Sequence, residues 1–497
     1  MALDWIILLI MALFTYLIVR RSVAGITTTP VWLLWLVLML PPVAWSIWSV
    51  VHGADQIPPL ELVLGMSILS IFLYWKLHQR GRRNLTPAAQ DRPSQVAEAA
   101  TPAPEVPQPL ATLRPIDKEE ETKLRNCFPW SVFYISNIEY RPQAIICRGQ
   151  LREKSSTIAY DRIKENVQAQ FGDRFVVLFQ EDMTGKPFFA LVPNPQLAAN
   201  RRNNAKLTRP VLALGLLVAT LYTTTLVGVE IADPENIAAL RDDPTILQRG
   251  LPYAIALMAI LGIHELGHYL AARYYKIKAT LPYFIPFPAF LGTFGAFIQM
   301  RSPVPNRKAL FDVSIAGPLA GFVVTIPILI WGLAHSTVVA LPENPQAVLN
   351  PNALSPNYSL LLALLSKLTL GAQLTAESAL DLHPVAIAGL LGLIATALNL
   401  MPVGQLDGGH IVHSMFGQRN GIAIGQISRF LLLGLSLLQP GFWVWAIILF
   451  FMPVADEPAL NDISELDNKR DMLGLLALGL LVLIILPMPS AIAQLLN

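Results

Sequence analysis

Apolar runs long enough to cross a lipid bilayer recur along this chain and constrain its fold more than any other feature. A membrane-spanning helix needs about 20 mostly apolar residues, and clear examples lie near residues 31–52, 210–229, 251–275 and 311–334. Hydrophobic residues make up 54% of the chain and charged residues only 14%, which is typical of proteins with several membrane spans. We therefore predict an all-α polytopic protein with about ten spans, embedded in the lipid bilayer.

Composition shifts divide the chain into five segments. Residues 1–83 contain about three apolar runs and predict an N-terminal membrane anchor. Residues 84–115, rich in Pro, Ala and Gln, are typical of a disordered linker. Residues 116–205 alternate helical and β-like patterns, which predicts a small soluble α+β domain on the cytoplasmic side. Residues 206–455 form the predicted membrane core, and residues 456–497 contain a predicted C-terminal span.

Local patterns predict the elements of these segments. In the α+β domain, periodicity predicts two helices and four strands. In the membrane core, the later apolar runs predict further spans, together with a surface helix in an outer loop. The expected elements are helices at 118–125 and 157–170, strands at 130–138, 144–149, 175–179 and 188–192, a surface helix at 358–370, and spans at 384–403, 422–438, 441–454 and 472–490.

Basic residues gather at the ends of the apolar runs and predict the topology. The formal net charge is only +2, so the chain has no electrostatic footprint for nucleic acid, and we expect no nucleic-acid partner. Under the positive-inside rule, Arg201 before the run at 210–229 and Arg273 after the run at 251–275 are cytoplasmic. The polar residues within the run at 251–275 then lie toward the cytoplasmic side.

The pentapeptide HELGH, from His264 to His268, lies inside one of the apolar runs. Residues four apart on a helix lie one above the other, so the two imidazoles can bind a single Zn²⁺. Glu265 lies beside them, where it can take a proton from a zinc-bound water whose pKa falls to about 7. A charged residue at mid-membrane costs about 2.5 to 3.5 kcal/mol, which disfavours a merely structural polar patch. The pattern predicts one catalytic Zn²⁺ per chain and hydrolysis of peptide bonds.

A third ligand must come from elsewhere, because a catalytic zinc usually has three protein ligands and one open position. Asp407 is the best candidate, since it stands near the end of another apolar run and is followed by Gly408 and Gly409. These glycines allow the backbone to turn or to pack closely. His410 and His413 are alternatives, because imidazole is an equally good zinc ligand. The residue types alone leave the choice open.

HELGH and the pattern Asn399-x-x-Pro402-x-x-x-x-Asp407-Gly408 together resemble the site-2 protease family of intramembrane zinc metalloproteases. The resemblance implies that Asp407 is the third zinc ligand. It also implies that Asn399 holds the substrate backbone or polarises its carbonyl group. The stretch Gly292–Ile298 resembles a re-entrant hairpin that dips into the membrane beside the site, where it would offer an edge to an unwound substrate.

More narrowly, the chain resembles the plastid and cyanobacterial branch of ethylene-dependent gravitropism-deficient and yellow-green proteins. Like that branch, it has no PDZ-sized insertion between Ile298 and Asp407. It departs from the branch at Gly149-Gln150-Leu151-Arg152, where Gln150 stands in place of an asparagine. The resemblance covers roughly residues 116–455 and implies a bacterial, cyanobacterial-type plasma or thylakoid membrane, with the site toward the cytoplasm.

The function that these observations favour is regulated intramembrane proteolysis, with a transmembrane protein as the substrate. Two other classes compete: a zinc-binding membrane scaffold without turnover, and a metal transporter. A scaffold would not need Glu265. A transporter needs ligands along a path between the two faces, whereas the topology places His264, His268 and Asp407 at similar depth. The sequence does not indicate the substrate or the oligomeric state.

Overall fold

The structure is a computed structural model of the whole chain, and it divides into two compact units, Met1–Pro107 and Gln108–Asn497. The linker predicted at 84–115 lies outside the described residues, as do most residues of the apolar runs near 5–19 and 58–75. The described residues are 16, 19, 29–52, 65–66, 69–70, 72–74, 76–77, 116–141, 144–182, 184–194, 209–234, 240, 243–288, 291–340, 358–374, 378–438 and 442–488.

In the first unit, the apolar run at 31–52 is helical but interrupted. Helix α2 spans Val31–Leu38 and α3 spans Leu40–His52, with Met39 between them. The first turn of α3 contains two prolines, which lack the N–H that a continuous helix would need. The prediction of a helical run is confirmed, and the interruption is a local consequence of proline.

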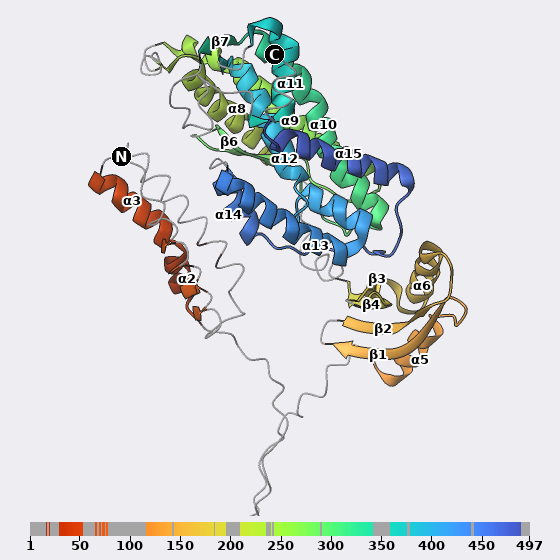
Figure 1. Cartoon of the computed structure of the whole chain (residues 1–497). Coiled ribbons are helices and arrows are strands. Elements are labelled where there is room, and N and C mark those ends of the chain that lie inside the picture. Colours follow the sequence, from red (N-terminus) through yellow and green to blue (C-terminus); the bar gives the residue numbers. More distant parts are fainter. Residues whose placement is uncertain are drawn as a thin grey trace, which may run out of the picture. The chain divides into compact units, whose positions relative to one another are not determined.

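The α+β region of the second unit is a four-stranded antiparallel sheet in the order β1-β2-β4-β3 with two helices (Figure 1). All six elements predicted here are confirmed within a few residues. Its core contains Phe179 and Phe189, which stack with ring centroids 4.0 Å apart. The elements are α5 (Lys118–Asn126), β1 (Phe133–Arg141), β2 (Ala144–Leu151), α6 (Ser156–Phe171), β3 (Phe175–Glu181) and β4 (Pro187–Pro193).

Gly149 lies in β2, in the tetrapeptide singled out from the sequence. A Cβ atom at this position would lie 2.0 Å from the carbonyl oxygen of Tyr134 on β1. The register between β1 and β2 shifts at this point, which brings the two backbones close together. Arg152 after the strand lies over the ring of Trp130, 4.5 Å from its centroid. Close packing of the sheet therefore explains the glycine, and a cation–π contact holds the arginine.

Four helices among the described residues are long and apolar enough to cross a membrane: Pro210–Ala232, Pro244–Tyr274, Arg307–Ala334 and Asp407–Leu437. They correspond to α8 (Pro210–Ala232), α9 (Leu247–Tyr274), α10 (Arg307–Ala334) and α13 (Asp407–Leu438). Three of them confirm predicted spans. The fourth is interrupted at Gly417, whose backbone angles are non-helical, so the part after this break corresponds to the span predicted at 422–438 and the helical part before it was not predicted.

The remaining helices of the second unit are shorter. Helix α11 (Leu360–Leu370) confirms the helix predicted at 358–370, and α12 spans Pro384–Leu400. Helix α14 (Trp443–Phe451) is shorter than the roughly 20 residues that a straight span requires. Helix α15 spans Asn468–Ile485. The predicted span at 441–454 is therefore a short apolar helix in this structure.

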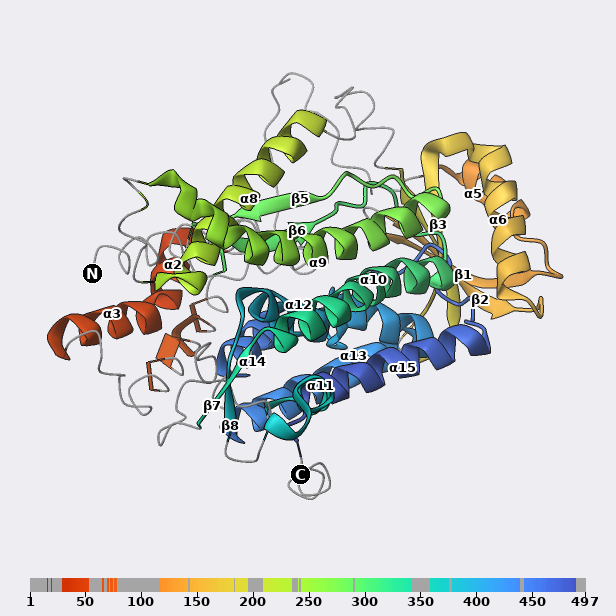
Figure 2. The same ribbon diagram turned by 90° about the horizontal axis from the view of Figure 1, so that it is seen from above.

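Two pairs of short strands accompany the helices. Strands β7 (Thr337–Ala340) and β8 (Ser378–Asp381) pair in the predicted outer loop. They were not predicted, because four-residue strands carry almost no alternation. Strands β5 (Tyr283–Pro286) and β6 (Thr293–Phe297) form an antiparallel hairpin, as expected from the resemblance. Figure 2 shows this hairpin beside α8 and α9.

Glycine at the hairpin turn is required by its surroundings. Gly292 has a φ of +81°, and a Cβ atom there would lie 2.4 Å from the Cα of Thr224 on α8. The hydroxyl group of Thr223 donates a hydrogen bond of 2.7 Å to the Gly292 carbonyl oxygen. The Tyr253 hydroxyl on α9 donates to the carbonyl oxygen of Leu291 at 3.1 Å. Both helices therefore hold the hairpin in place.

Small residues bring the three helices of the core together, and Figure 2 shows α9 and α10 running side by side. A Cβ atom at Gly267 on α9 would lie 2.5 Å from the carbonyl oxygen of Ala316 on α10. A Cβ atom at Gly389 on α12 would lie 2.8 Å from the Cβ of Leu329 on α10. Such contacts are typical of helix packing in membranes, where small residues allow backbones to approach.

Candidate metal centre

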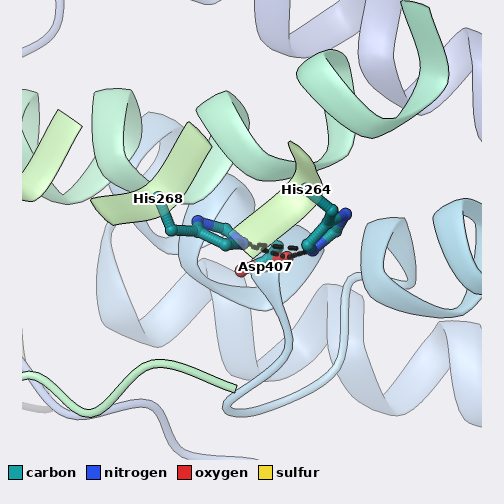
Figure 3. A group of neighbouring side chains, drawn as sticks. All are labelled: His264, His268 and Asp407. Carbon is teal, nitrogen blue, oxygen red and sulfur yellow. Dashed lines mark hydrogen bonds and ion pairs between the residues drawn. The ribbon is translucent and has the colours of Figure 1, made fainter. Parts of the chain in front are cut away.

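Three side chains that can bind a metal meet between α9 and the start of α13 (Figure 3). The Nε2 atoms of His264 and His268 are 3.2 Å apart. An Asp407 carboxylate oxygen lies 3.6 Å from Nε2 of His264 and 3.2 Å from Nε2 of His268. Helix periodicity places the two imidazoles one turn apart on one face. The chain thus brings together the two histidines of HELGH and the distant aspartate.

The surroundings orient both imidazoles. Nδ1 of His268 lies 2.7 Å from the carbonyl oxygen of Val313 on α10, so Nδ1 carries the hydrogen and the Nε2 lone pair faces Asp407. A Cβ atom at Gly317 would lie 2.1 Å from His268 Nε2, and one at Gly321 would lie 3.1 Å from His264 Nδ1. Nothing in the sequence indicated that the glycines of α10 lie directly against the imidazoles.

The donor set fits a zinc ion. Ligand atoms about 2.0–2.1 Å from a tetrahedral ion lie about 3.3 Å from one another, close to the observed 3.2, 3.2 and 3.6 Å. Lone pairs of neutral imidazoles and a carboxylate repel each other at such distances unless a cation lies among them. The histidines are only 7% and 8% exposed, so water screens this repulsion poorly. Two nitrogen atoms and one oxygen atom also leave a fourth position open.

Glu265 and Asn399 lie at the edge of this group. Glu265 is buried on α9, and its carboxylate receives a hydrogen bond from the backbone N–H of Ile298, just after β6. The side-chain amide nitrogen of Asn399, near the end of α12, lies 3.3 Å from Nε2 of His264. An acid or base and an amide donor are therefore next to the three candidate ligating atoms.

The two alternative zinc ligands have other partners. Nδ1 of His410 and Nδ1 of His413 each lie 2.7 Å from an Asp456 oxygen, and Nε2 of His413 lies 3.0 Å from Asp462. Neither histidine belongs to the group around Asp407. Sequence reasoning missed both aspartates, and the only signal for them was a pair of acids just beyond an apolar run.

Comparisons with known proteins agree with this geometry. Residues 252–435 match the family described as Peptidase family M50, and residues 122–199 match the EGY3 middle domain. The chain is 38% identical over 246 residues to "Probable zinc metalloprotease EGY1, chloroplastic" of Arabidopsis thaliana, covering 49% of this chain and 44% of that protein. It is 31% identical over 369 residues to "Probable zinc metalloprotease EGY2, chloroplastic" of the same plant, covering 73% and 64%.

A third relative, "Probable zinc metallopeptidase EGY3, chloroplastic" of Arabidopsis thaliana, is 26% identical over 394 residues, which cover 74% of this chain and 66% of that protein. The chain thus spans less than two thirds of the length of these curated relatives. No solved structure matches it significantly. The M50 match contains His264, His268, Asn399 and Asp407, and the middle-domain match covers the α+β sheet. The membrane core is therefore similar, over residues 252–435, to peptidase family M50.

Proposed function

We propose that this protein is an intramembrane zinc metalloprotease that hydrolyses peptide bonds within or near transmembrane segments of membrane-protein substrates. The observation that carries the proposal is the convergence of two imidazoles and one carboxylate, with the separate carboxylate of Glu265 beside them. Three of these groups lie on a helix long enough to span a membrane. The names of the relatives, each a probable zinc metalloprotease or metallopeptidase, point the same way.

Each residue has a distinct role in this mechanism. His264, His268 and Asp407 would hold the zinc ion. When bound, zinc polarises water and the scissile carbonyl group. The Glu265 carboxylate takes the proton from the attacking water and then gives it to the leaving amine. The side-chain amide of Asn399 donates a hydrogen bond to the substrate backbone, which orients the carbonyl group and stabilises its developing negative charge.

The substrate must present an unwound backbone to this site, because a helix keeps its carbonyl groups hydrogen-bonded. The hairpin of β5 and β6 supports such a role, since the residue after β6 contacts Glu265. A strand has free backbone groups at its edge, so an extended substrate segment can add to the hairpin. Helix-breaking residues in a substrate should then favour cleavage.

The competing functions explain less of the geometry. A zinc-binding scaffold has no use for a buried carboxylate beside the ligands. A transporter requires successive sites across the membrane, and within the described residues only His264, His268 and Asp407 form a group of three potential metal ligands. A metalloprotease explains both the buried carboxylate of Glu265 and the gathering of the three ligands at one place.

We also propose the finer organisation expected from the sequence. The chain then has about ten spans, divided into a membrane anchor at 1–83, a linker at 84–115, a cytoplasmic domain at 116–205, a protease core at 206–455 and a C-terminal span at 456–497. The membrane is a bacterial, cyanobacterial-type plasma or thylakoid membrane, with the site toward the cytoplasm. Four apolar helices and the basic residues at their ends support this arrangement.

Cleavage by purified protein tests the proposal. Detergent-solubilised protein is incubated with a membrane-spanning peptide, with and without a chelator, and zinc is measured by elemental analysis. We expect about one zinc per chain and chelator-sensitive cleavage. Glu265→Gln should retain zinc and lose cleavage, by about 10²- to 10⁴-fold in kcat, because the proton acceptor is removed. Zinc without cleavage by the wild-type protein would favour the scaffold, and unchanged cleavage by Glu265→Gln would refute its role.

A further inference from the structure

The helix that carries Asp407 is much shorter than α13 as a whole. Gly417 has non-helical backbone angles, with φ of 80° and ψ of 166°, so α13 is two helices joined at a break. Residues 407–416 therefore form a separate short helix, which we call the ligand helix. Gly404, with a φ of +54°, lies in the turn before it. Helices shorter than about 12 residues are marginal by themselves, so contacts with other elements must fix the direction of the ligand helix.

Two aspartates from the segment after α14 contact one face of the ligand helix. Asp456 lies 2.7 Å from both His410 and His413, which are three residues apart and so lie on one face. Asp462 lies 3.0 Å from the other ring nitrogen of His413. The side chains of Asp456, Asp462 and His413 are 5%, 6% and 2% exposed. A carboxylate on each nitrogen of His413 is satisfied when both nitrogens carry hydrogen.

Arg307 contacts the carboxyl end of the same helix. Its Nε donates a hydrogen bond of 2.8 Å to the carbonyl oxygen of Ser414, and its guanidinium also donates to the carbonyl oxygen of His413 at 3.4 Å. The last carbonyl groups of a helix have no partner within the helix, and arginine is a suitable donor for them. Arg307 is the first residue of α10, the helix that lies behind His268.

The segment with the two aspartates is also bound to the four-stranded sheet. Phe179 on the edge strand β3 donates from its N–H to the Leu460 carbonyl oxygen at 2.7 Å, and accepts from the Asp462 N–H at 2.9 Å. On its other side, Asn461 bridges to Asn306, next to Arg307. The segment is thus fixed from both sides where it meets the ligand helix.

We propose that Asp456, Asp462 and Arg307 form a clamp that fixes the direction of the ligand helix and thereby holds Asp407 at the metal site. All three are positioning residues, because they act through the helix and do not touch the ligating atoms. In the clamp, two carboxylates face one doubly protonated imidazole, and the guanidinium group of Arg307 binds carbonyl groups near the end of the same helix. This inference rests on the proposed metal site, but zinc binding tests it without any cleavage assay.

A matched pair of variants tests the clamp. Asp456→Asn removes the buried charge and keeps the shape of the side chain, whereas Glu457→Gln makes the same chemical change at an exposed neighbour. The zinc affinity of each full-length protein is measured by competition with a chromogenic chelator. We expect Asp456→Asn to weaken zinc binding about 10-fold, at the lower end for groups that orient metal ligands. Glu457→Gln should leave the affinity unchanged, and equal affinities would overturn the clamp.

A double-mutant cycle that combines Asp456→Asn with Asp407→Ala separates an effect on the position of Asp407 from a general loss of stability. If Asp456 acts through Asp407, then Asp456→Asn should have no further effect on the zinc affinity of Asp407→Ala. A general loss of stability would weaken zinc binding in both backgrounds and would contradict the proposal. If Asp456→Asn does not fold, Asp462→Asn replaces it in the same cycle, because it removes only the carboxylate at Nε2 of His413. Absence of zinc from the wild-type protein would instead refute the proposed metal site.

The zinc-loaded variants supply a second readout. A misplaced Asp407 alters the site without altering contacts to the rest of the substrate, so Asp456→Asn should lower kcat and leave KM within about twofold. A change confined to KM would place Asp456 in substrate binding and would contradict a positioning role.

Discussion

Two clusters of imidazole and carboxylate groups each include a residue of the ten-residue ligand helix and differ in how their atoms face each other. At the metal centre, Asp407 meets two Nε2 atoms that are themselves only 3.2 Å apart. At the clamp, Asp456 and Asp462 each take a separate nitrogen of His413 at 2.7 and 3.0 Å. The first cluster gathers lone pairs around one point, whereas the second pairs each donor with an acceptor.

The difference shows why residue type alone does not identify a metal ligand. Imidazole can bind zinc or donate to a carboxylate, and the choice depends on whether a carboxylate already faces it. His413 has a carboxylate at each ring nitrogen, and Nδ1 of His410 lies 2.7 Å from Asp456, so both histidines already face carboxylates. At the metal centre, two imidazole nitrogens and a carboxylate oxygen converge on one point, an arrangement that suits a shared cation.

The largest expected effect comes from comparing Asp407, at the metal centre, with His410, at the clamp. Asp407→Ala removes a zinc ligand and should weaken zinc binding by more than about 100-fold, beyond the range for groups outside the ligand set. His410→Ala should weaken it by less than about 10-fold, because its partner belongs to the clamp. Elemental analysis after dialysis measures both. Zinc lost from His410→Ala but kept by Asp407→Ala would exchange the roles of the two residues.

The next effect concerns Asn399, whose amide nitrogen lies 3.3 Å from Nε2 of His264, one of the three proposed ligands, without belonging to that group. Asn399→Ala should lower kcat by about 10²-fold, the usual cost of losing one donor to a developing negative charge. The bound zinc should stay at the wild-type amount, because no ligand has changed. Cleavage kinetics and elemental analysis of the same preparation measure the two quantities. Loss of zinc together with activity would show that Asn399 supports the metal rather than the substrate.

Two glycines of α10 lie against the imidazoles of the metal centre, and their substitutions should differ in effect. A methyl group at Gly317 would lie 2.1 Å from His268 Nε2, whereas one at Gly321 would lie 3.1 Å from His264 Nδ1. Gly317→Ala must therefore displace His268, and we expect zinc binding to weaken about 10-fold. Gly321→Ala needs only a small shift and should have a smaller effect. Chelator competition on both variants measures this order, and a reversed order would contradict the packing described for α10.

The comparison also shows how much could be predicted from the sequence. HELGH could be placed on a spanning helix because local periodicity decides helix geometry, and the sheet elements followed for the same reason. The choice between Asp407 and His410 needed the resemblance, since both are good ligands. Asp456 could not be predicted as a partner of His413, because the pairing joins residues 43 positions apart. The short helix at 407–416 was not predicted for a related reason: its first turn contacts Asp456, which is distant in the sequence.

The smallest expected effect is the pH dependence of the clamp. Burial raises the pKa of Asp456, but hydrogen bonds from His410 and His413 outweigh burial and leave the pKa below its ordinary value. A carboxyl group whose pKa is lowered by folding stabilises the folded state above its unfolded pKa of about 3.9, and that stability is lost as the pH falls through the folded pKa. The apparent melting temperature of the wild-type protein should therefore fall below about pH 4.

Asp456→Asn supplies the control, because an amide does not titrate in this range. Its melting temperature should lie below that of the wild type at pH 7 and should depend less on pH below 4. Glu457→Gln removes a solvent-exposed carboxylate and should keep the wild-type profile. Parallel profiles of melting temperature against pH for all three proteins would mean that the two histidines do not hold Asp456 in its charged form. The contrast between the clamp and the metal centre would then lose its electrostatic basis.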